Sequence, residues 1–233
     1  MVKRYAAEAI GTFMIVFAPV AFASNGGDAT LLSAALVSGL PVLAMVYALG
    51  PISAAHFNPA VTLGFAVAKR FPWRYVPAYW LSQVIGSIAA ALTAFVIFGH
   101  SGGAHTPADP TALAKNVGIE AAITAFLMLT IISVATDKRV SSTIPGIAIG
   151  LAVVVGVLIG GPVTGGSMNP ARSLGPALLT GGQALTNYWI YIIGPCIGAV
   201  IGAVAFESIR LEPEHAVGVP NELLEALREI EHR

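Results

Sequence analysis

The longest stretches of the chain without a charged side chain limit what it can fold into. No Asp, Glu, Lys or Arg occurs in the stretches 29–68, 75–108, 140–171 and 173–206. One helix that crosses a bilayer core needs about 20 apolar residues, so each stretch is long enough for a span. Charged residues make up only 10% of the chain, against about 25% in soluble domains. The sequence predicts an all-α integral membrane protein.

The balance of charge and the single cysteine exclude several classes of function. The 12 basic residues are matched by 12 acidic ones, so the chain has no strongly basic face for a nucleic acid. Cys196 is the only cysteine, which excludes an internal disulfide and a cysteine-rich metal site. We therefore expect no nucleic-acid partner, no metal and no cofactor.

Six apolar segments are long enough to cross the membrane. They lie near residues 5–24, 31–50, 75–98, 118–136, 144–161 and 188–209. Two further apolar pieces, 57–68 and 168–179, are too short to cross, and each follows a run of small residues. Such short pieces inside a membrane protein are typically re-entrant or interfacial. We expect six transmembrane helices and two re-entrant segments.

The basic residues predict the orientation of the spans. Ten of the twelve fall on one side of the predicted topology: Lys3, Arg4, Lys69, Arg70, Arg74, Lys138, Arg139, Arg210, Arg228 and Arg233. The opposite side has only Lys115, and Arg172 lies inside a short apolar piece. Basic residues accumulate on the cytoplasmic side of a membrane protein. Both termini should be cytoplasmic.

The sequence around the two short pieces is an internal repeat. Residues 52–60 recur as residues 163–171, and both copies end in Asn-Pro-Ala. Upstream, Glu8 precedes the first asparagine by nearly the same spacing as Glu120 precedes the second. Each copy contributes three spans, an odd number, so the second copy must be inverted. Inverted repeats bring their special segments together near the middle of the membrane.

The repeat also defines the expected domain organisation. We expect a channel domain over residues 1–212, with inverted repeats at about 3–98 and 115–210. Residues 213–233 would form a cytoplasmic tail. Its last part, Pro220–Arg233, has leucines and an isoleucine at helical spacing among acidic residues, which predicts a short amphipathic helix.

The triplets Asn58-Pro59-Ala60 and Asn169-Pro170-Ala171 are typical helix starts. Asparagine is a preferred N-cap, and proline suits the first turn because its missing N–H is not needed there. About ten residues follow each asparagine before the apolar piece ends, which is about 15 Å of helix. Two such half-helices would meet in the middle of the bilayer and present two positive dipole ends. The asparagine amides could then donate hydrogen bonds to a neutral molecule.

Four motifs together make the chain similar to a known family. They are Ala7-Glu8-Ala9-Ile10-Gly11-Thr12-Phe13, His56-Phe57-Asn58-Pro59-Ala60-Val61-Thr62, Ala135-Thr136-Asp137-Lys138 and Asn169-Pro170-Ala171-Arg172-Ser173. Across residues 3–210 the sequence resembles the aquaporins and aquaglyceroporins, the major intrinsic proteins. The resemblance implies six transmembrane helices plus two re-entrant half-helices, the aquaporin fold. It also implies a homotetramer with one pore in each subunit, and no enzymatic activity.

The same resemblance implies a selectivity filter of four residues. Arg172 corresponds to the arginine of the family's filter, and Ser38, Val157 and Gly166 correspond to its other three positions. Strict water channels typically carry a large aromatic residue in place of Ser38 and a histidine in place of Val157. The smaller side chains of this sequence predict a wider opening.

These filter residues resemble the nodulin-like branch of plants and some bacteria. Members of that branch carry boric, arsenous or silicic acid, glycerol, urea and water. Ser173 also departs from typical glycerol facilitators, which have an aspartate there. The resemblance implies a passive channel for small uncharged solutes and water that excludes ions and protons. The expected location is the inner membrane of a bacterium.

Three other functions fit parts of the sequence less well. A narrower filter would make a strict water channel. A secondary transporter can also have inverted repeats and broken helices, but few acids that could couple transport fall within the spans: Glu8, Glu120 and, near the cytoplasmic end of the last span, Glu207. An intramembrane hydrolase would need Ser53 and His56 as a nucleophile and base, and no third orienting residue is evident.

The remaining polar residues in or near the apolar segments have expected structural roles. Glu8 and Glu120 occupy matching places in the repeats, where a buried carboxylate can accept hydrogen bonds from the loop that leads to a half-helix. His56, two positions before Asn58, should hold the same loop in place. His105 lies in the polar loop 99–116, and we expect it to be solvated.

Overall fold

The computed structural model of the chain describes residues 1–26, 30–137, 139–141 and 144–210. Within these residues the regular elements are all helices. The long ones are α1 (Val2–Ser24), α2 (Leu31–Ser53), α4 (Val76–Phe98), α5 (Leu113–Thr136), α6 (Pro145–Thr164) and α9 (Ile190–Ile209). The short ones are α3 (Pro59–Val67), α7 (Pro170–Thr180), α8 (Gly182–Thr186) and the 3₁₀ helix η1 (Trp73–Tyr75). In this part of the chain six helices are long and apolar enough to cross a membrane, which confirms the predicted number of spans.

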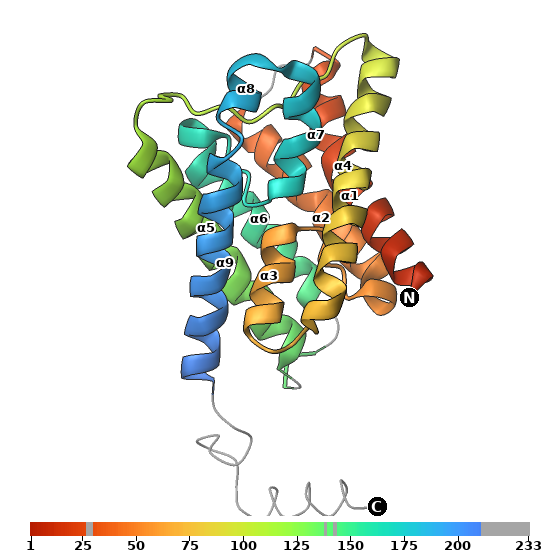
Figure 1. Ribbon diagram of the computed structural model, residues 1–233, viewed down its shortest axis with the longest axis vertical. Helices are drawn as coiled ribbons and strands as arrows, with labels where there is room; N and C mark the ends of the chain where they lie inside the picture. The colour runs from red at the N-terminus through yellow and green to blue at the C-terminus, as the bar shows by residue number, and fades with distance from the viewer. Residues whose placement is uncertain (27–29, 138, 142–143, 211–233) are drawn as a thin grey trace, which may run out of the picture.

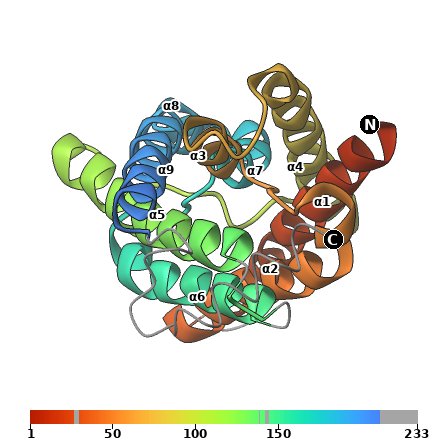
Figure 2. The same ribbon diagram turned by 90° about the horizontal axis from the view of Figure 1, so that it is seen from below.

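The two short helices α3 and α7 lie one below the other inside the bundle (Figure 1). Seen along the bundle, they lie between α4 and α9 (Figure 2). Each packs on the last long helix of the other repeat, α3 on α9 and α7 on α4. The N-terminal end of α1 and the C-terminal end of α9 both lie in the lower half of the molecule in Figure 1.

Pairs of glycines related by the repeat bring the long helices close together. Gly39 of α2 and Gly150 of α6 occupy matching positions and face each other, because a Cβ on Gly39 would overlap with the carbonyl oxygen of Gly150. Gly86 lies against the carbonyl of Ala9, and the matching Gly198 against the carbonyl of Ala121. Small residues allow membrane helices to approach backbone to backbone. The repeat seen in the sequence is therefore a repeat of helix contacts.

The second helix of each repeat is longer than predicted. The sequence predicts an end near Gly50 and Gly161, before the prolines that follow, but α2 continues to Ser53 and α6 to Thr164. A proline inside a helix removes one hydrogen bond, and the helix can continue beyond it. The non-helical approaches to the half-helices are consequently short, covering residues 54–58 and 165–169.

The prediction for the C-terminal tail, including the amphipathic helix over Pro220–Arg233, lies outside the described residues. The half-helices themselves begin where predicted, at Pro59 and Pro170. They end at Val67 and Thr180, next to the predicted ends.

Candidate functional site

The two approach segments share an unusual backbone conformation. Ala54, Ala55 and Phe57 have positive φ angles of 70°, 52° and 49°, and the matching Gly165, Gly166 and Met168 have 89°, 64° and 57°. This left-handed region suits glycine and costs other residues about 1–2 kcal/mol each. The strain in both copies must therefore be held by the surrounding contacts.

The two asparagines cap the half-helices and join them. The Oδ1 atom of Asn58 accepts a hydrogen bond from the N–H of Ala60 at 2.9 Å, and that of Asn169 accepts from Ala171 at 2.9 Å. Each amide also donates across the junction: Nδ2 of Asn58 lies 2.8 Å from the carbonyl oxygen of Met168. In return, Nδ2 of Asn169 lies 2.9 Å from the carbonyl oxygen of Phe57. The helix N-termini thus meet, and each amide nitrogen carries a second N–H besides the one used in this junction.

A buried glutamate holds each approach segment. Glu8 of α1 accepts hydrogen bonds from the backbone N–H groups of His56 at 3.0 Å and Phe57 at 2.7 Å. Glu120 of α5 accepts from the N–H groups of Ser167 at 2.9 Å and Met168 at 2.8 Å. Both carboxylates are completely buried. The geometry thus repeats itself down to the individual carboxylate oxygen.

Two tyrosines to which the sequence interpretation assigns no supporting role also hold these segments. The hydroxyl of Tyr79 donates to the carbonyl of Ser53, and that of Tyr191 to the carbonyl of Thr164, both at 2.7 Å. These tyrosines occupy matching places in the two repeats, with a spacing close to that of the asparagines. That spacing is the signal that could have identified them.

His56 is held by side chains of its own repeat. Its Nδ1 atom lies 3.1 Å from the hydroxyl of Thr62, and its ring stacks on Phe65 at 4.7 Å between centroids. The Oγ of Ser53 instead accepts from the N–H of Ala55. Ser53 and His56 therefore have separate partners, which does not fit the nucleophile and base of a hydrolase.

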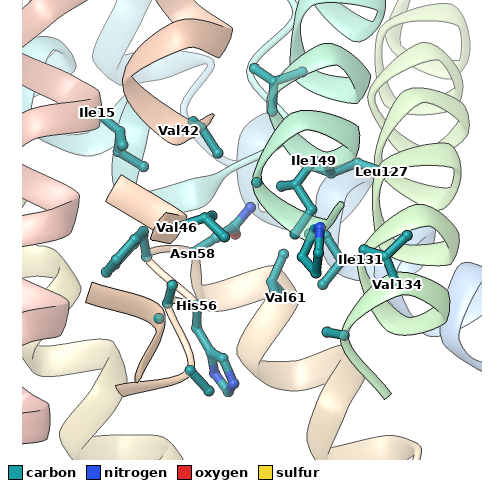
Figure 3. Close-up of a pocket in the computed structure, with 18 of the residues that line it drawn as sticks. Ile15, Val42, Val46, His56, Asn58, Val61, Leu127, Ile131, Val134 and Ile149 are labelled. Carbon is teal, nitrogen blue, oxygen red and sulfur yellow. The ribbon is translucent and has the colours of Figure 1, made fainter. Parts of the chain in front are cut away.

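A cavity of about 540 Å³ runs along the meeting point of the half-helices. Its lining includes Asn58 and Asn169, and its wall is mostly apolar, with the valine, leucine and isoleucine side chains labelled in Figure 3. Figure 3 shows the Asn58 side chain among Val42, Val46 and Ile149. Its lining also includes Tyr47 and Val140. We call it the large cavity.

A second cavity of about 190 Å³, the small cavity, lies beyond the large one. Its lining includes Val157 and residues 103–105 of the loop between the repeats. Ser38 and Arg172 line both cavities. The boundary between the two spaces is therefore at these two side chains.

The four predicted filter residues come together at this boundary. One guanidinium nitrogen of Arg172, Nη2, donates to the Ser38 hydroxyl at 2.8 Å, and the other, Nη1, donates to the carbonyls of Gly166 at 2.9 Å and Ser167 at 3.1 Å. Gly166 lies against Val157, because a Cβ on the glycine would be 3.0 Å from the Val157 Cα. Arg172 is only 7% exposed. A buried cation thus lies at the boundary between the two cavities and is held by backbone carbonyls.

His105 is not solvated, so the expectation for this residue is wrong. It is 7% exposed, and its Nδ1 atom lies 3.0 Å from the hydroxyl of Ser173. The loop that carries it folds inward against α6, where the N–H of Ala108 donates to the carbonyl of Val163 at 2.9 Å. Loop composition alone could not show this, because the partners of His105 lie in the other half of the chain.

Comparisons with known proteins identify the family of the chain. The family model for the major intrinsic proteins matches residues 1–206. Aquaporin NIP1-1 of Zea mays is 46% identical over 217 residues, which cover 90% of this chain and 75% of the maize protein. Putative aquaporin NIP4-1 of Arabidopsis thaliana is 43% identical over 218 residues, which cover 90% of this chain and 75% of that protein.

A solved structure agrees at the level of the fold. The X-ray structure of the aquaglyceroporin from Plasmodium falciparum superposes with a TM-score of 0.80 at 22% sequence identity, covering 89% of this chain and 96% of that one. The relatives named above are plant proteins, so the expected bacterial inner membrane is not borne out. The nodulin-like resemblance and the aquaporin fold are confirmed: the chain belongs to the major intrinsic protein family, as an integral membrane channel of the NIP-type aquaporins and not an enzyme.

Proposed function

We propose that the chain is a passive channel for small uncharged solutes and water. The solutes are metalloid acids such as boric or arsenous acid, glycerol and urea, and ions and protons are excluded. The observation that carries the proposal is the arrangement along the two cavities. Their lining includes hydrogen-bond donors from Asn58, Asn169 and Arg172, and most of the other residues that line the large cavity are apolar.

Exclusion of cations follows from the charges along this path. The N-termini of α3 and α7 meet beside the large cavity, and each carries a partial positive charge of roughly half a unit. Arg172 adds a full positive charge at the boundary with the small cavity. A cation would have to lose water next to these groups. A neutral solute meets no such repulsion and can accept hydrogen bonds from the asparagine amides.

The selectivity filter consists of Ser38, Val157, Gly166 and Arg172. The hydroxyl of Ser38 donates to the carbonyl of Ala34 at 2.7 Å, so it meets Arg172 as an acceptor. A solute hydroxyl can take the place of Ser38 as the acceptor for Nη2 of Arg172. A polyol or an undissociated acid can thus exchange one hydrogen bond for another at the narrow place.

A strict water channel is the second candidate. The observation that favours it is the direct hydrogen bond between Arg172 and Ser38, which joins the two sides of the boundary between the cavities. If this bond persists during transport, the opening admits water and excludes larger solutes. The two candidates differ in solute size and not in mechanism.

The remaining structural organisation is part of the proposal. Residues 1–212 form the channel domain, with repeats at about 3–98 and 115–210, and residues 213–233 form a cytoplasmic tail. Both termini are cytoplasmic, as the distribution of basic residues indicates. The channel is a homotetramer. The large apolar side chains exposed along the long helices, such as Leu81, Ile85 and Val96 of α4, suit contact with lipid or with neighbouring subunits.

The experiment is stopped-flow light scattering on proteoliposomes that contain the full chain. Water efflux is measured in a sucrose gradient, and solute entry is measured in glycerol, urea and boric acid gradients. The proposal expects all four to exceed the rates of empty liposomes. Fast water efflux without solute entry would select the strict water channel.

The same preparation separates a channel from a secondary transporter. A protonophore that collapses the pH gradient should leave the solute rates unchanged, because a passive channel uses only the solute gradient. Loss of solute entry with the protonophore would contradict the channel and favour a proton-coupled carrier.

A further inference from the structure

The loop between the repeats places one side chain, His105, next to the filter residues. This loop spans residues 99–112, and its histidine ring lies beside the approach segment of the second half-helix. A Cβ on Gly165 would be 2.8 Å from Cδ2 of His105. The ring is also 5.6 Å from that of Tyr191 between centroids. His105 lines the small cavity together with Arg172.

A chain of hydrogen bonds connects His105 to the filter segment. Nδ1 of His105 lies 3.0 Å from the hydroxyl of Ser173, and that hydroxyl lies 2.5 Å from the hydroxyl of Ser167. The Ser167 hydroxyl lies 2.9 Å from the carbonyl of Asn169. Ser167 is also one of the two residues whose carbonyls hold Nη1 of Arg172. His105 and Arg172 are thus linked through Ser173 and Ser167.

The direction of this chain can be deduced from its last member. A carbonyl only accepts hydrogen bonds, so the Ser167 hydroxyl donates its single hydrogen to Asn169. Ser173 must then donate to Ser167, and its own hydroxyl oxygen is left to accept from His105. Nδ1 of His105 is therefore the donor, and the chain runs from the histidine toward the filter segment.

In the first repeat, the hydroxyl that corresponds to that of Ser173 has partners from within the repeat. There the hydroxyl of Thr62, which corresponds to Ser173, lies 3.1 Å from Nδ1 of His56 and accepts from Nε2 of Gln83 at 3.0 Å. The second repeat has a serine in place of His56, and Pro195 in the position of Gln83. Neither Ser167 nor Pro195 has a long side chain that could donate a hydrogen bond to Ser173. His105 supplies it from the connecting loop.

We propose that His105 is a positioning residue of the filter: it donates from Nδ1 to Ser173 and so helps to hold the side chain of Ser167, the residue whose carbonyl accepts from Nη1 of Arg172. This inference rests on the proposed function, because it assigns the filter to Arg172. Without the donor, the Ser173 hydroxyl loses the group that orients it, and the Ser167 side chain is held less firmly, although the Ser167 N–H still donates to Glu120. Ser167 carries one of the two carbonyls that hold Nη1, so this carbonyl gains freedom to move. The space of the ring also opens toward the small cavity. Larger solutes should then pass more easily relative to water.

The experiment compares three variants with the wild type in proteoliposomes. His105→Leu removes the donor, and His105→Asn places an amide nitrogen at the same number of bonds from the backbone as Nδ1. His100→Ala is the matched control, because His100 lies in the same loop, is exposed, and has its ring nitrogen near the carbonyl of Phe98, away from the filter. The measured quantity is the ratio of glycerol entry to water efflux, which does not depend on the amount of folded channel in the vesicles.

We expect His105→Leu to raise this ratio severalfold, and His105→Asn and His100→Ala to keep the wild-type ratio. A wild-type ratio in His105→Leu would overturn the positioning role, and so would an equal change in the Asn and Leu variants. If His105→Leu does not fold, His105→Gln takes its place, because it puts the donor one bond further from the backbone. A changed ratio in His105→Gln together with a wild-type ratio in His105→Asn would then support the inference. A wild type that carries no glycerol would instead contradict the wide filter of the proposed function, and the two failures are therefore distinguishable.

Discussion

The two repeats hold their half-helices in the same way but present different side chains to the cavities. Glu8 and Glu120 each accept from two successive backbone N–H groups, at 3.0 and 2.7 Å in the first repeat and at 2.9 and 2.8 Å in the second. In contrast, Val61 of the first repeat stands in the position that matches Arg172. Val61 lines only the large cavity, whereas Arg172 lines both cavities. The support of the backbone is duplicated and the charged part of the filter is present once.

This difference shows which constraints come from the membrane and which from selectivity. Irregular backbone within the bilayer needs internal partners wherever it occurs, so both repeats keep the glutamate, the tyrosine and the capping asparagine. A single fixed cation is enough to discriminate along one path. A second one in place of Val61 would put another desolvated charge in an apolar wall.

The largest effect is expected from removing the shared support. In Glu8→Gln and Glu120→Gln, one of the two carboxylate oxygens becomes an NH₂ group that faces a backbone N–H. Each buried donor left without an acceptor costs about 1–3 kcal/mol, with further cost from repulsion. We expect both variants to lose most of the monodisperse protein in size-exclusion chromatography after detergent extraction.

The comparison would fail if only one of these two variants were affected. An unaffected Glu8→Gln beside a misfolded Glu120→Gln would mean that the first repeat holds its approach segment by other contacts. Glu207→Gln, which changes a partly exposed acid paired with Arg70, is the control for substitution of a carboxylate as such.

The next largest effect is expected at Arg172, the charged filter residue that only the second repeat has. Arg172→Val gives the second repeat the residue of the first, and it removes the hydrogen bonds from the guanidinium to Gly166, Ser167 and Ser38. One such bond contributes about 1.5–3 kcal/mol, so we expect the ratio of glycerol to water flux to rise roughly tenfold or more, with a measurable proton leak. Stopped-flow swelling and an internal pH dye give the two readings, and unchanged values for both would show that Arg172 does not discriminate. Val61→Ala, in the matching position, should leave the proton leak at the level of the wild type.

Smaller effects on stability, of opposite sign in the two repeats, are expected at the matched positions Ala54 and Gly165. Gly165→Ala places a Cβ on a residue with φ of 89° and 2.8 Å from the His105 ring, which should destabilise the protein by about 1–2 kcal/mol or more. Ala54→Gly relieves the same strain in the first repeat. Glycine loses more conformational entropy on folding than alanine, which offsets part of this gain. The net effect of Ala54→Gly should be to stabilise the folded protein by about 0.5–1 kcal/mol. Thermal unfolding in detergent measures both changes, and a destabilised Ala54→Gly would show that strain in this segment is not what distinguishes the two copies.

The smallest effect is a pH dependence of stability that comes from His105 in the loop between the repeats. Burial, and secondarily the nearby charge of Arg172, place the pKa of His105 well below 6.5. Below pH 6.5 the unfolded chain therefore binds a proton at this residue that the folded chain does not, and stability falls as the pH is lowered. The linkage amounts to about 0.8 kcal/mol between pH 8 and pH 6 for one histidine. The unfolding temperature of the wild type should fall more over this range than that of His105→Asn; parallel curves would mean that folding does not lower the pKa of His105.

Much of the fold follows from patterns that depend on short stretches of sequence. Long apolar segments with few or no charged residues locate all six spans, and Asn58-Pro59 and Asn169-Pro170 mark the starts of α3 and α7 because capping is a local property. The predicted ends of α2 and α6 come too early. A proline costs a helix one hydrogen bond, and whether the helix stops there depends on packing around the next turn, which a sequence pattern does not contain.

The candidate site is predictable where the repeat or the family resemblance marks it. Ser38, Val157, Gly166 and Arg172 rest on resemblance, and the structure brings them together, although the direct bond between Ser38 and Arg172 is not predictable. The prediction for His105 is wrong because its neighbours in the chain are polar, whereas its burial depends on Ser173 and Gly165, which lie in the second repeat. Such long-range docking of a loop leaves no periodic signal.

The central claim is that the boundary formed by Ser38 and Arg172 selects solutes by width and hydrogen bonding. The most direct measurement is stopped-flow entry of glycerol and boric acid into proteoliposomes with the wild type and with Ser38→Phe, alongside water efflux from the same vesicles. We predict fast solute entry in the wild type, and at least a tenfold loss of solute entry in Ser38→Phe while water efflux remains well above that of empty liposomes. Equal solute entry in the two proteins would contradict the claim, because a phenyl ring at this boundary could not then be in the path of the solute.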